Sequence, residues 1–266
     1  MPNDAALRLG IFLGLFVLLA AAEALYPRRP MLSPRSLRWA THGAMLGLAT
    51  VILRIAAIIF PLLGATAAAY FAVQSGWGVF QWLSLPEWIE ILLAIVLLDL
   101  AIWAQHVATH HIPILWRIHR VHHADRELDA SSALRFHPLE ILLSAAYKLA
   151  VILALGPALI AVVVFEIVLN ASAMFNHANW ALPPRIERWL RLGIVTPDMH
   201  RIHHSILRHE HNHNFGFCLS IWDRAFGTYC AEPENGQLGM TIGLADWQHD
   251  DRTVRLGWML GLPFRR

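Results

Sequence analysis

Charged residues are scarce in this chain. Asp, Glu, Lys and Arg make up 15% of its 266 residues, whereas about 25% is usual for a soluble globular domain. Hydrophobic residues make up 56%, and the formal net charge is only +2. The length allows one or two soluble domains, but the long apolar runs favour a single membrane-embedded unit. The small net charge gives no indication of nucleic-acid binding.

Several functional signatures are also missing. The two cysteines, Cys218 and Cys230, have neither metal-type nor redox-type spacing, so we interpret both as packing residues. The sequence lacks the His-Glu-x-x-His motif of many zinc hydrolases, and it lacks haem-attachment, flavin and nicotinamide fingerprints. Any electron-transfer chemistry in this chain therefore needs a separate electron donor.

Histidine is the residue that the chain has in excess, with 16 in total. The pattern His-x-x-His-His occurs at residues 119–123 and 200–204, and His-x-x-x-His occurs at 106–110. Residues at i, i+3 and i+4 share one face of a helix, so each pattern aims its imidazoles at one point. So many imidazoles suggest two metal ions, and nitrogen ligands suit iron, zinc or copper. Isolated histidines such as His42 and His249 are expected to be ordinary surface or core residues.

Apolar segments predict membrane helices over residues 9–25, 39–60 and 87–104. The first segment ends in Glu-Ala-Leu-Tyr-Pro rather than in a small-residue cleavage site, so it is expected to be a retained helix and not a signal peptide. Four arginines crowd the loop at 27–38. The positive-inside rule places this loop in the cytoplasm and the amino terminus on the opposite side.

A further apolar block covers residues 139–169 and is longer than one crossing of a bilayer about 30 Å thick. Histidine patterns lie on both sides of this block. They meet only if the block crosses the membrane an even number of times or not at all. We therefore predict a helical hairpin that turns near Gly156-Pro157, and we expect Glu166 to face the protein interior.

The order of the polar motifs resembles a known family. The motifs are His-x-x-x-His at 106–110, His-x-x-His-His at 119–123, Arg-x-His-Pro-x-Glu at 135–140, Asn-His at 176–177, His-x-x-His-His at 200–204, Asn-Phe-Gly at 214–216 and Trp-Asp-Arg-x-Phe-Gly-Thr at 222–228. This series, over roughly residues 95 to 230, is similar to the fatty acid hydroxylase superfamily, which includes sterol desaturases, methylsterol oxidases and alkylglycerol monooxygenase.

The resemblance implies an integral membrane, non-haem di-iron oxygenase. Such an enzyme hydroxylates or desaturates a C–H bond of a lipid with dioxygen and electrons from a separate donor protein. The implied cofactors are two iron ions, with zinc as an alternative occupant of the isolated protein. The lipid stays open among sterols, fatty acyl chains, carotenoids and ether lipids.

The resemblance also implies a set of metal ligands, and it implies no catalytic residue beyond them. The implied ligands are His106, His110, His119, His122, His123, His177, His200, His203 and His204, with His137 as a further candidate. Asp99, Asn176 and Asp198 are candidates for hydrogen bonding to these imidazoles. His209, His211 and His213 are left out of the set. Several relatives have a further histidine where this chain has Ala181, so the coordination number of one metal stays open.

These observations predict an all-α fold, a polytopic membrane helical bundle with a cytoplasmic, histidine-rich helical cap that holds a dinuclear metal site. Residues 1–95 would be amino-terminal transmembrane helices, 96–230 the catalytic domain with its membrane hairpin, and 231–266 a carboxy-terminal tail. Two other functions stay open. One is a membrane metal-binding or transport protein, which would place histidines along a path across the bilayer. The other is a zinc-dependent lipid hydrolase.

Overall fold

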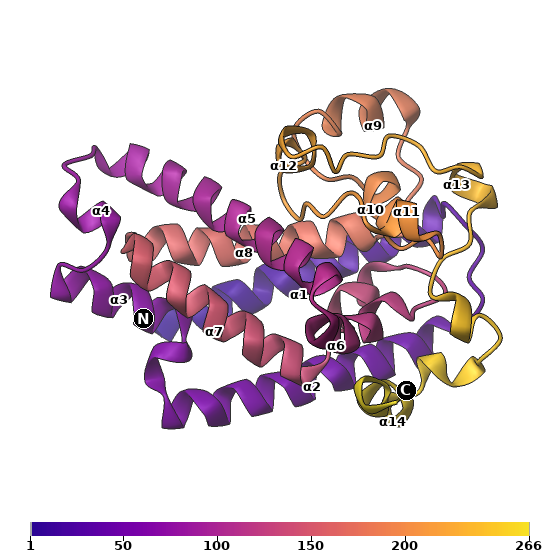
Figure 1. Cartoon of the computed structure of the whole chain (residues 1–266), viewed down its shortest axis with the longest axis horizontal. Helices are drawn as coiled ribbons and strands as arrows, with labels where there is room; N and C mark the ends of the chain where they lie inside the picture. The colour runs from indigo at the N-terminus through magenta and orange to yellow at the C-terminus, as the bar shows by residue number, and fades with distance from the viewer. Residues whose placement is uncertain (1, 266) are drawn as a thin grey trace.

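Five long apolar helices form the body of the protein. The computed structural model describes residues 2–265, and regular secondary structure in this range is helical. The five helices are α1 (Pro2–Leu25), α2 (Arg35–Ile59), α5 (Glu87–His111), α7 (Pro138–Leu155) and α8 (Leu159–His177). Each is long and apolar enough to cross a membrane, and Figure 1 shows them side by side along the longest axis. The all-helical class and the membrane helices predicted from the sequence are confirmed.

Short elements occupy the two ends of this bundle. At one end η1 (Pro61–Leu63), α3 (Ala65–Ser75) and α4 (Val79–Trp82) connect α2 to α5. The opposite end, which we call the polar end, consists of residues 112–137 and 178–265 (Figure 1). It contains α6 (Pro113–His123), η2 (Ala130–Leu134), α9 (Pro184–Leu190), α10 (Pro197–His203), α11 (Arg208–His211), α12 (Ile221–Ala225), α13 (Gly236–Gly239), η3 (Ala245–Trp247), η4 (Asp251–Val254), α14 (Leu256–Gly261) and η5 (Leu262–Phe264).

The chain turns back between α7 and α8 at Gly156, in the place where the sequence predicts a turn. Gly156 has φ +62°, and a Cβ added to it would lie 2.2 Å from the carbonyl oxygen of Trp77. No larger residue fits this close approach of two backbones. α5 packs against both α7 and α8. The turn therefore returns the chain to the polar end, with α5 in contact with both arms.

The arginine-rich segment at 27–38 docks onto the polar end, and the loop predicted there is shorter than expected because α2 already begins at Arg35. Arg28 pairs with Asp198, with Nη2 and Oδ2 2.9 Å apart. Arg38 is fully buried and donates to both oxygens of Asp125, at 2.7 and 2.9 Å, and to Asp129 at 2.7 Å. These bonds tie the segment after α6 to α2, and removal of one partner of a buried ion pair costs about 3–5 kcal/mol. The arginines are thus structural anchors as well as a positive cluster.

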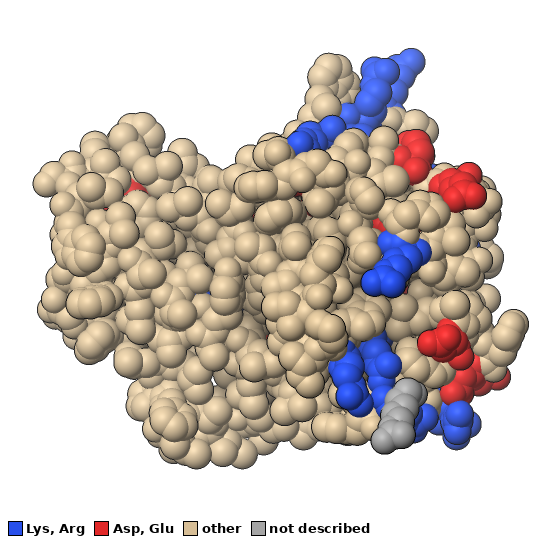
Figure 2. Space-filling view, in the orientation of Figure 1, with Lys and Arg blue, Asp and Glu red and all other residues tan. Residues whose placement is uncertain are grey.

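The surface divides in the same way as the fold. On the face in Figure 2, most charged side chains lie over the polar end, and the surface of the long helices is nearly uncharged. Large apolar side chains such as Leu13, Val17, Val51 and Ile58 are exposed on α1 and α2. An apolar surface of this extent needs a lipid or protein cover. With five helices of membrane-crossing length, the protein is an integral membrane protein.

Candidate metal centre

Nine histidines converge at the junction between the long helices and the polar end. They come from four helices because α5 and α8 end in histidines and because α6 and α10 carry the two His-x-x-His-His patterns. Pro113 and Pro197 stand in the first turns of α6 and α10, where proline is compatible with a helix. The side-chain oxygen of Thr196 caps α10 by accepting the backbone N–H of Met199. The spacing seen in the sequence therefore becomes one face on each helix.

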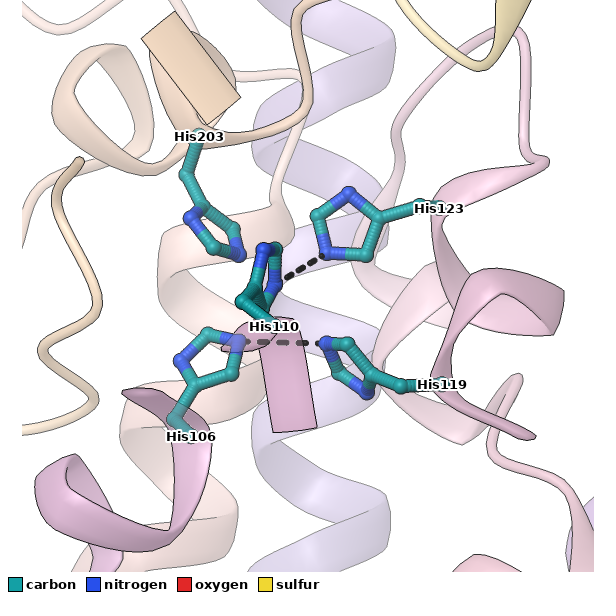
Figure 3. A group of neighbouring side chains, drawn as sticks. All are labelled: His106, His110, His119, His123 and His203. Carbon is teal, nitrogen blue, oxygen red and sulfur yellow. Dashed lines mark hydrogen bonds between the residues drawn. The ribbon is translucent and has the colours of Figure 1, made fainter. Parts of the chain in front are cut away.

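The nine imidazoles form two groups, each with its ring nitrogens within 4.8 Å of one another. We call His106, His110, His119, His123 and His203 group A, and His122, His177, His200 and His204 group B. Figure 3 shows group A, in which rings from α5, α6 and α10 point toward a common centre. The structure thus brings together nine of the ten histidines that the resemblance implies as ligands. The prediction that each His-x-x-His-His pattern aims its imidazoles at one point is wrong, because each pattern divides between the groups: His122 lies in group B apart from His119 and His123, and His203 lies in group A apart from His200 and His204.

Hydrogen bonds fix the protonated nitrogen in several of these rings. The Nδ1 of His106 lies 2.7 Å from the carbonyl oxygen of Phe215, and the Nδ1 of His119 lies 2.6 Å from Oε1 of Glu140. A carbonyl or an ionised carboxylate only accepts, so each Nδ1 must carry the ring proton. In the neutral ring the Nε2 atom is then bare. The two bare Nε2 atoms, of His106 and His119, lie only 3.2 Å apart.

Two nitrogen lone pairs that face each other at this distance repel each other. A cation bound between or beside them removes this repulsion. The same tautomer holds for His177, whose Nδ1 lies 2.6 Å from the carbonyl oxygen of Ala173, and for His203, whose Nδ1 lies 2.8 Å from that of His213. The Nε2 atom of His203 is buried and has no hydrogen-bond partner among the described residues. Unpartnered buried nitrogens of this kind are costly unless they bind an ion.

The distances suit metal coordination. Two nitrogens that bind one ion at about 2.1 Å and at right angles lie about 3.0 Å apart. In group A the Nε2 atoms of His110 and His123 are 3.1 Å apart. In group B the Nε2 atom of His177 lies 3.0 Å from that of His122 and 3.1 Å from that of His200. The donor set is all imidazole, which suits iron, zinc or copper, so each group fits one such ion.

Burial keeps the imidazoles neutral. The pKa values of His122, His123, His200, His203 and His204 lie well below the ordinary histidine value, first because burial removes water and then because nearby imidazoles repel a second positive charge. A neutral imidazole is the form that binds a metal. These five imidazoles are therefore neutral at neutral pH and can bind a metal without losing a proton.

Within residues 2–265, Glu140 is the one carboxylate that is hydrogen-bonded to a histidine of groups A and B. The sequence analysis did not single it out. It is buried at the start of α7, three residues after His137. Carboxylates commonly orient metal-binding imidazoles and raise their basicity. The available signal in the sequence was the Arg-x-His-Pro-x-Glu motif, which contains this acid three residues after His137.

His137, the further ligand candidate, joins neither group. Its Nδ1 accepts the backbone N–H of Leu139 at 3.2 Å, and its Nε2 lies 3.3 Å from the carbonyl oxygen of Leu260. The side chain therefore caps the start of α7, where an unpaired backbone N–H needs an acceptor. The structure gives it a role in starting a helix rather than a place beside the metal groups.

The three polar residues expected beside the imidazoles also make other contacts. Asp99 and Asn176 hydrogen-bond backbone groups of residues 217–219, and Asp198 pairs with Arg28. None of the three is hydrogen-bonded to a histidine of the groups in the described part of the chain. Asp99 and Asn176 instead hold the segment just after Phe215, whose carbonyl orients His106. Asp99 and Asn176 therefore act on His106 only indirectly, through the backbone of residues 215–219.

An apolar cavity of about 200 Å³ adjoins group A. His106, His119 and Glu140 are among its lining residues. The apolar part of its lining comes from several long helices and from the segment after Phe215. It includes Phe12, Leu46, Ala49, Ile102, Met174 and Phe217. A cavity with this largely apolar lining admits a hydrocarbon chain.

Comparison with known proteins now identifies the family. Residues 91–228 match the fatty acid hydroxylase family. This range is more than half of the chain and contains all nine histidines of groups A and B. The chain belongs to the fatty acid hydroxylase family. The resemblance inferred from the motif order is thereby confirmed.

Three relatives indicate the range of lipids that this family acts on. The chain is 27% identical to alkylglycerol monooxygenase of Homo sapiens over 73% of this chain and 42% of that protein. It is 29% identical to an ornithine lipid hydroxylase of Rhizobium tropici over 68% and 54%. It is 25% identical to cholesterol 25-hydroxylase of Rattus norvegicus over 56% and 49%. The chain thus spans about half the length of these relatives. No solved structure matches it.

Proposed function

We propose that this fatty acid hydroxylase family member is a membrane-bound hydroxylase of a lipid, with one iron ion in group A and one in group B. The observation that carries the proposal is the bare Nε2 pair of His106 and His119, two residues that line an apolar cavity. Bound there, two iron ions supply the chemistry that inserts an oxygen atom from dioxygen into a C–H bond, with electrons from a separate donor protein. Zinc is the alternative occupant of the isolated protein.

The protein's own groups have three tasks in this proposal. Glu140 and the backbone carbonyls of Phe215, His213 and Ala173 hold protons on Nδ1 atoms, which keeps the opposing Nε2 atoms free for metal. The cavity places one C–H bond of the lipid beside group A. Its apolar lining excludes water, so the reacting carbon meets the metal site in a dry environment.

The three relatives are a monooxygenase and two hydroxylases, which supports hydroxylation as the outcome here; desaturation at the same C–H bond is the alternative. The substrate reaches the cavity from the bilayer, because the lining comes from long helices with apolar outer faces. We place groups A and B on the cytoplasmic side. The loop at 27–38, which the positive-inside rule assigns to the cytoplasm, docks onto the polar end through Arg28 and Asp198.

The two other functions have less support. A metal transporter needs ligands along a path through the membrane, but the histidines of groups A and B come together from the last turns of α5 and α8 and from α6 and α10. A zinc hydrolase usually keeps an open position beside three protein ligands. Here one group has five imidazoles and the other has four.

The direct test is oxygen incorporation. The protein is purified without air, loaded with ferrous iron and supplied with membrane lipids, a chemical reductant and isotopically labelled dioxygen. We expect labelled hydroxyl groups in one lipid class, and none with the His122→Ala variant. Label-free products, or lipid cleavage without oxygen consumption, would reject the proposal.

A further inference from the structure

Three charged side chains meet inside the bundle, away from the metal groups. Glu166 on α8 pairs with Arg8 on α1, at 2.5 Å, and with Lys148 on α7, at 3.4 Å. All three belong to helices of membrane-crossing length and are only partly exposed. Glu166 thus faces the interior, as expected from the sequence. Two cations share one carboxylate here, so this cluster carries a formal charge of +1.

The extra positive charge lies on the wall of the substrate cavity. Lys148 and Asn170 line the large cavity, and a smaller cavity of about 40 Å³ shares Asn170 with it and is lined by Arg8 and Glu166. The Arg8–Glu166 contact is the shorter of the two, so Lys148 has the weaker interaction with Glu166. A charge inside the membrane is costly unless it is paired. An anionic group brought in by the lipid would complete the pairing.

The distance to the metal groups is set by α7. Lys148 and Glu140 both line the cavity, and residues 140 to 148 span about 12 Å at about 1.5 Å per residue. Glu140 contacts His119 of group A. A lipid held by its anionic group at Lys148 therefore presents a carbon well down its chain, and not the carbon next to the anionic group, to group A.

We propose that the substrate is a single-chain lipid with an anionic group; this inference rests on the function proposed above. Lys148 binds the anionic group beside the Arg8–Glu166 pair, and the lipid chain extends from there to group A. The geometry assigns to Lys148 a part in specificity and none in metal binding. The anionic group is a carboxylate or a phosphate monoester, since both supply the missing negative charge. A neutral lipid of the same chain length leaves Lys148 with only its longer contact to Glu166, which Arg8 already shares.

Binding measured without turnover tests this assignment. The metal-loaded protein in nanodiscs of uncharged lipid is titrated with palmitate, hexadecyl phosphate and hexadecanol. We expect palmitate or hexadecyl phosphate to bind about tenfold or more tightly than hexadecanol, and the stronger of the two identifies the anionic group. Equal binding of all three probes would overturn the proposal.

Substitution of Lys148 gives the second arm. Lys148→Met leaves Arg8 and Glu166 as a balanced pair, so the variant is expected to fold and to keep its iron. It should lose the preference for the anionic probes, whereas Lys148→Arg should keep it. Arg54→Met removes an exposed cation of α2 that lines neither cavity and should change nothing. An unchanged preference in Lys148→Met would overturn the assignment. If the wild-type protein binds the anionic probes preferentially but incorporates no oxygen into lipid, the proposed function is rejected and the assignment of Lys148 stands.

Discussion

The Nδ1 atom of His119 lies 2.6 Å from Oε1 of Glu140, and both side chains are buried. This contact joins α6 to the first turn of α7. It also determines which nitrogen of His119 is free to bind a metal. Glu140→Ala should therefore lower the affinity of group A for iron about 10- to 100-fold, as expected when an acceptor behind a ligand imidazole is lost.

Iron titration of the purified Glu140→Ala protein, with detection of the metal that stays bound, measures this effect. Glu140→Gln keeps an oxygen acceptor and should fall between wild type and Glu140→Ala. Glu87→Gln changes an exposed acid at the far end of α5 and serves as the control. Wild-type iron affinity in Glu140→Ala would show that the contact has no part in metal binding.

The buried ion network at Arg38 should control the stability of the fold. Burial raises the pKa of Asp125, but the charges of Arg38 and Arg135 outweigh it and hold the pKa well below its usual range. Arg38→Met leaves this carboxylate without its main partner and should lower the free energy of unfolding by about 3–5 kcal/mol. Thermal unfolding in detergent measures the loss. Arg252→Met removes an exposed arginine that pairs with Asp250 and should change the stability little, so equal losses would refute this account.

The metal-free protein should become less stable as the pH falls below about 6.5, the pKa of histidine in an unfolded chain. The folded-state pKa values are lowered, so only the unfolded chain takes up protons in this window, and protonation favours unfolding. The slope is about 1.4 kcal/mol per pH unit for each proton taken up. The histidines involved are His122, His123, His200, His203 and His204. Thermal unfolding at several pH values checks the sign, and a midpoint that rises on acidification would contradict it.

Filling the cavity should stop turnover without removing iron. Ala49 lines the cavity from α2 and is not part of either histidine group. Ala49→Phe places a ring in the space assigned to the lipid chain, and we expect at least about a tenfold loss of lipid binding with unchanged iron content. Ala150→Phe, at an exposed position of α7, is the matched control. Full lipid binding in Ala49→Phe would place the substrate elsewhere.

The helical parts of the site were predictable because their signals are local. The i, i+3, i+4 spacing places His119, His122 and His123 on one helix, and hydropathy gives the long helices. The division into group A and group B was not predictable, because neighbours on the same helix go to different groups: His122 lies in group B and His123 in group A. That choice depends on how α6 packs against α8 and α10.

The roles of individual polar residues could not be predicted from the sequence either. His137 and Glu140 stand three positions apart in one motif, yet the first caps α7 and the second contacts His119. Which of them faces the histidines depends on the rotation of α7 about its axis. Asp99 precedes His106 on α5, but its carboxylate is occupied by backbone N–H groups of residues 218–219.

The central claim is that groups A and B each hold one iron ion. The most direct measurement is the iron content per chain after anaerobic purification and reconstitution, for wild type, His203→Ala, His122→Ala and the exposed control His249→Ala. The account predicts two ions in wild type and in the control. It predicts about one in each of the other variants, because each removes a ligand from a single group. Fewer than two ions in wild type, or full iron content in both His203→Ala and His122→Ala, would contradict it.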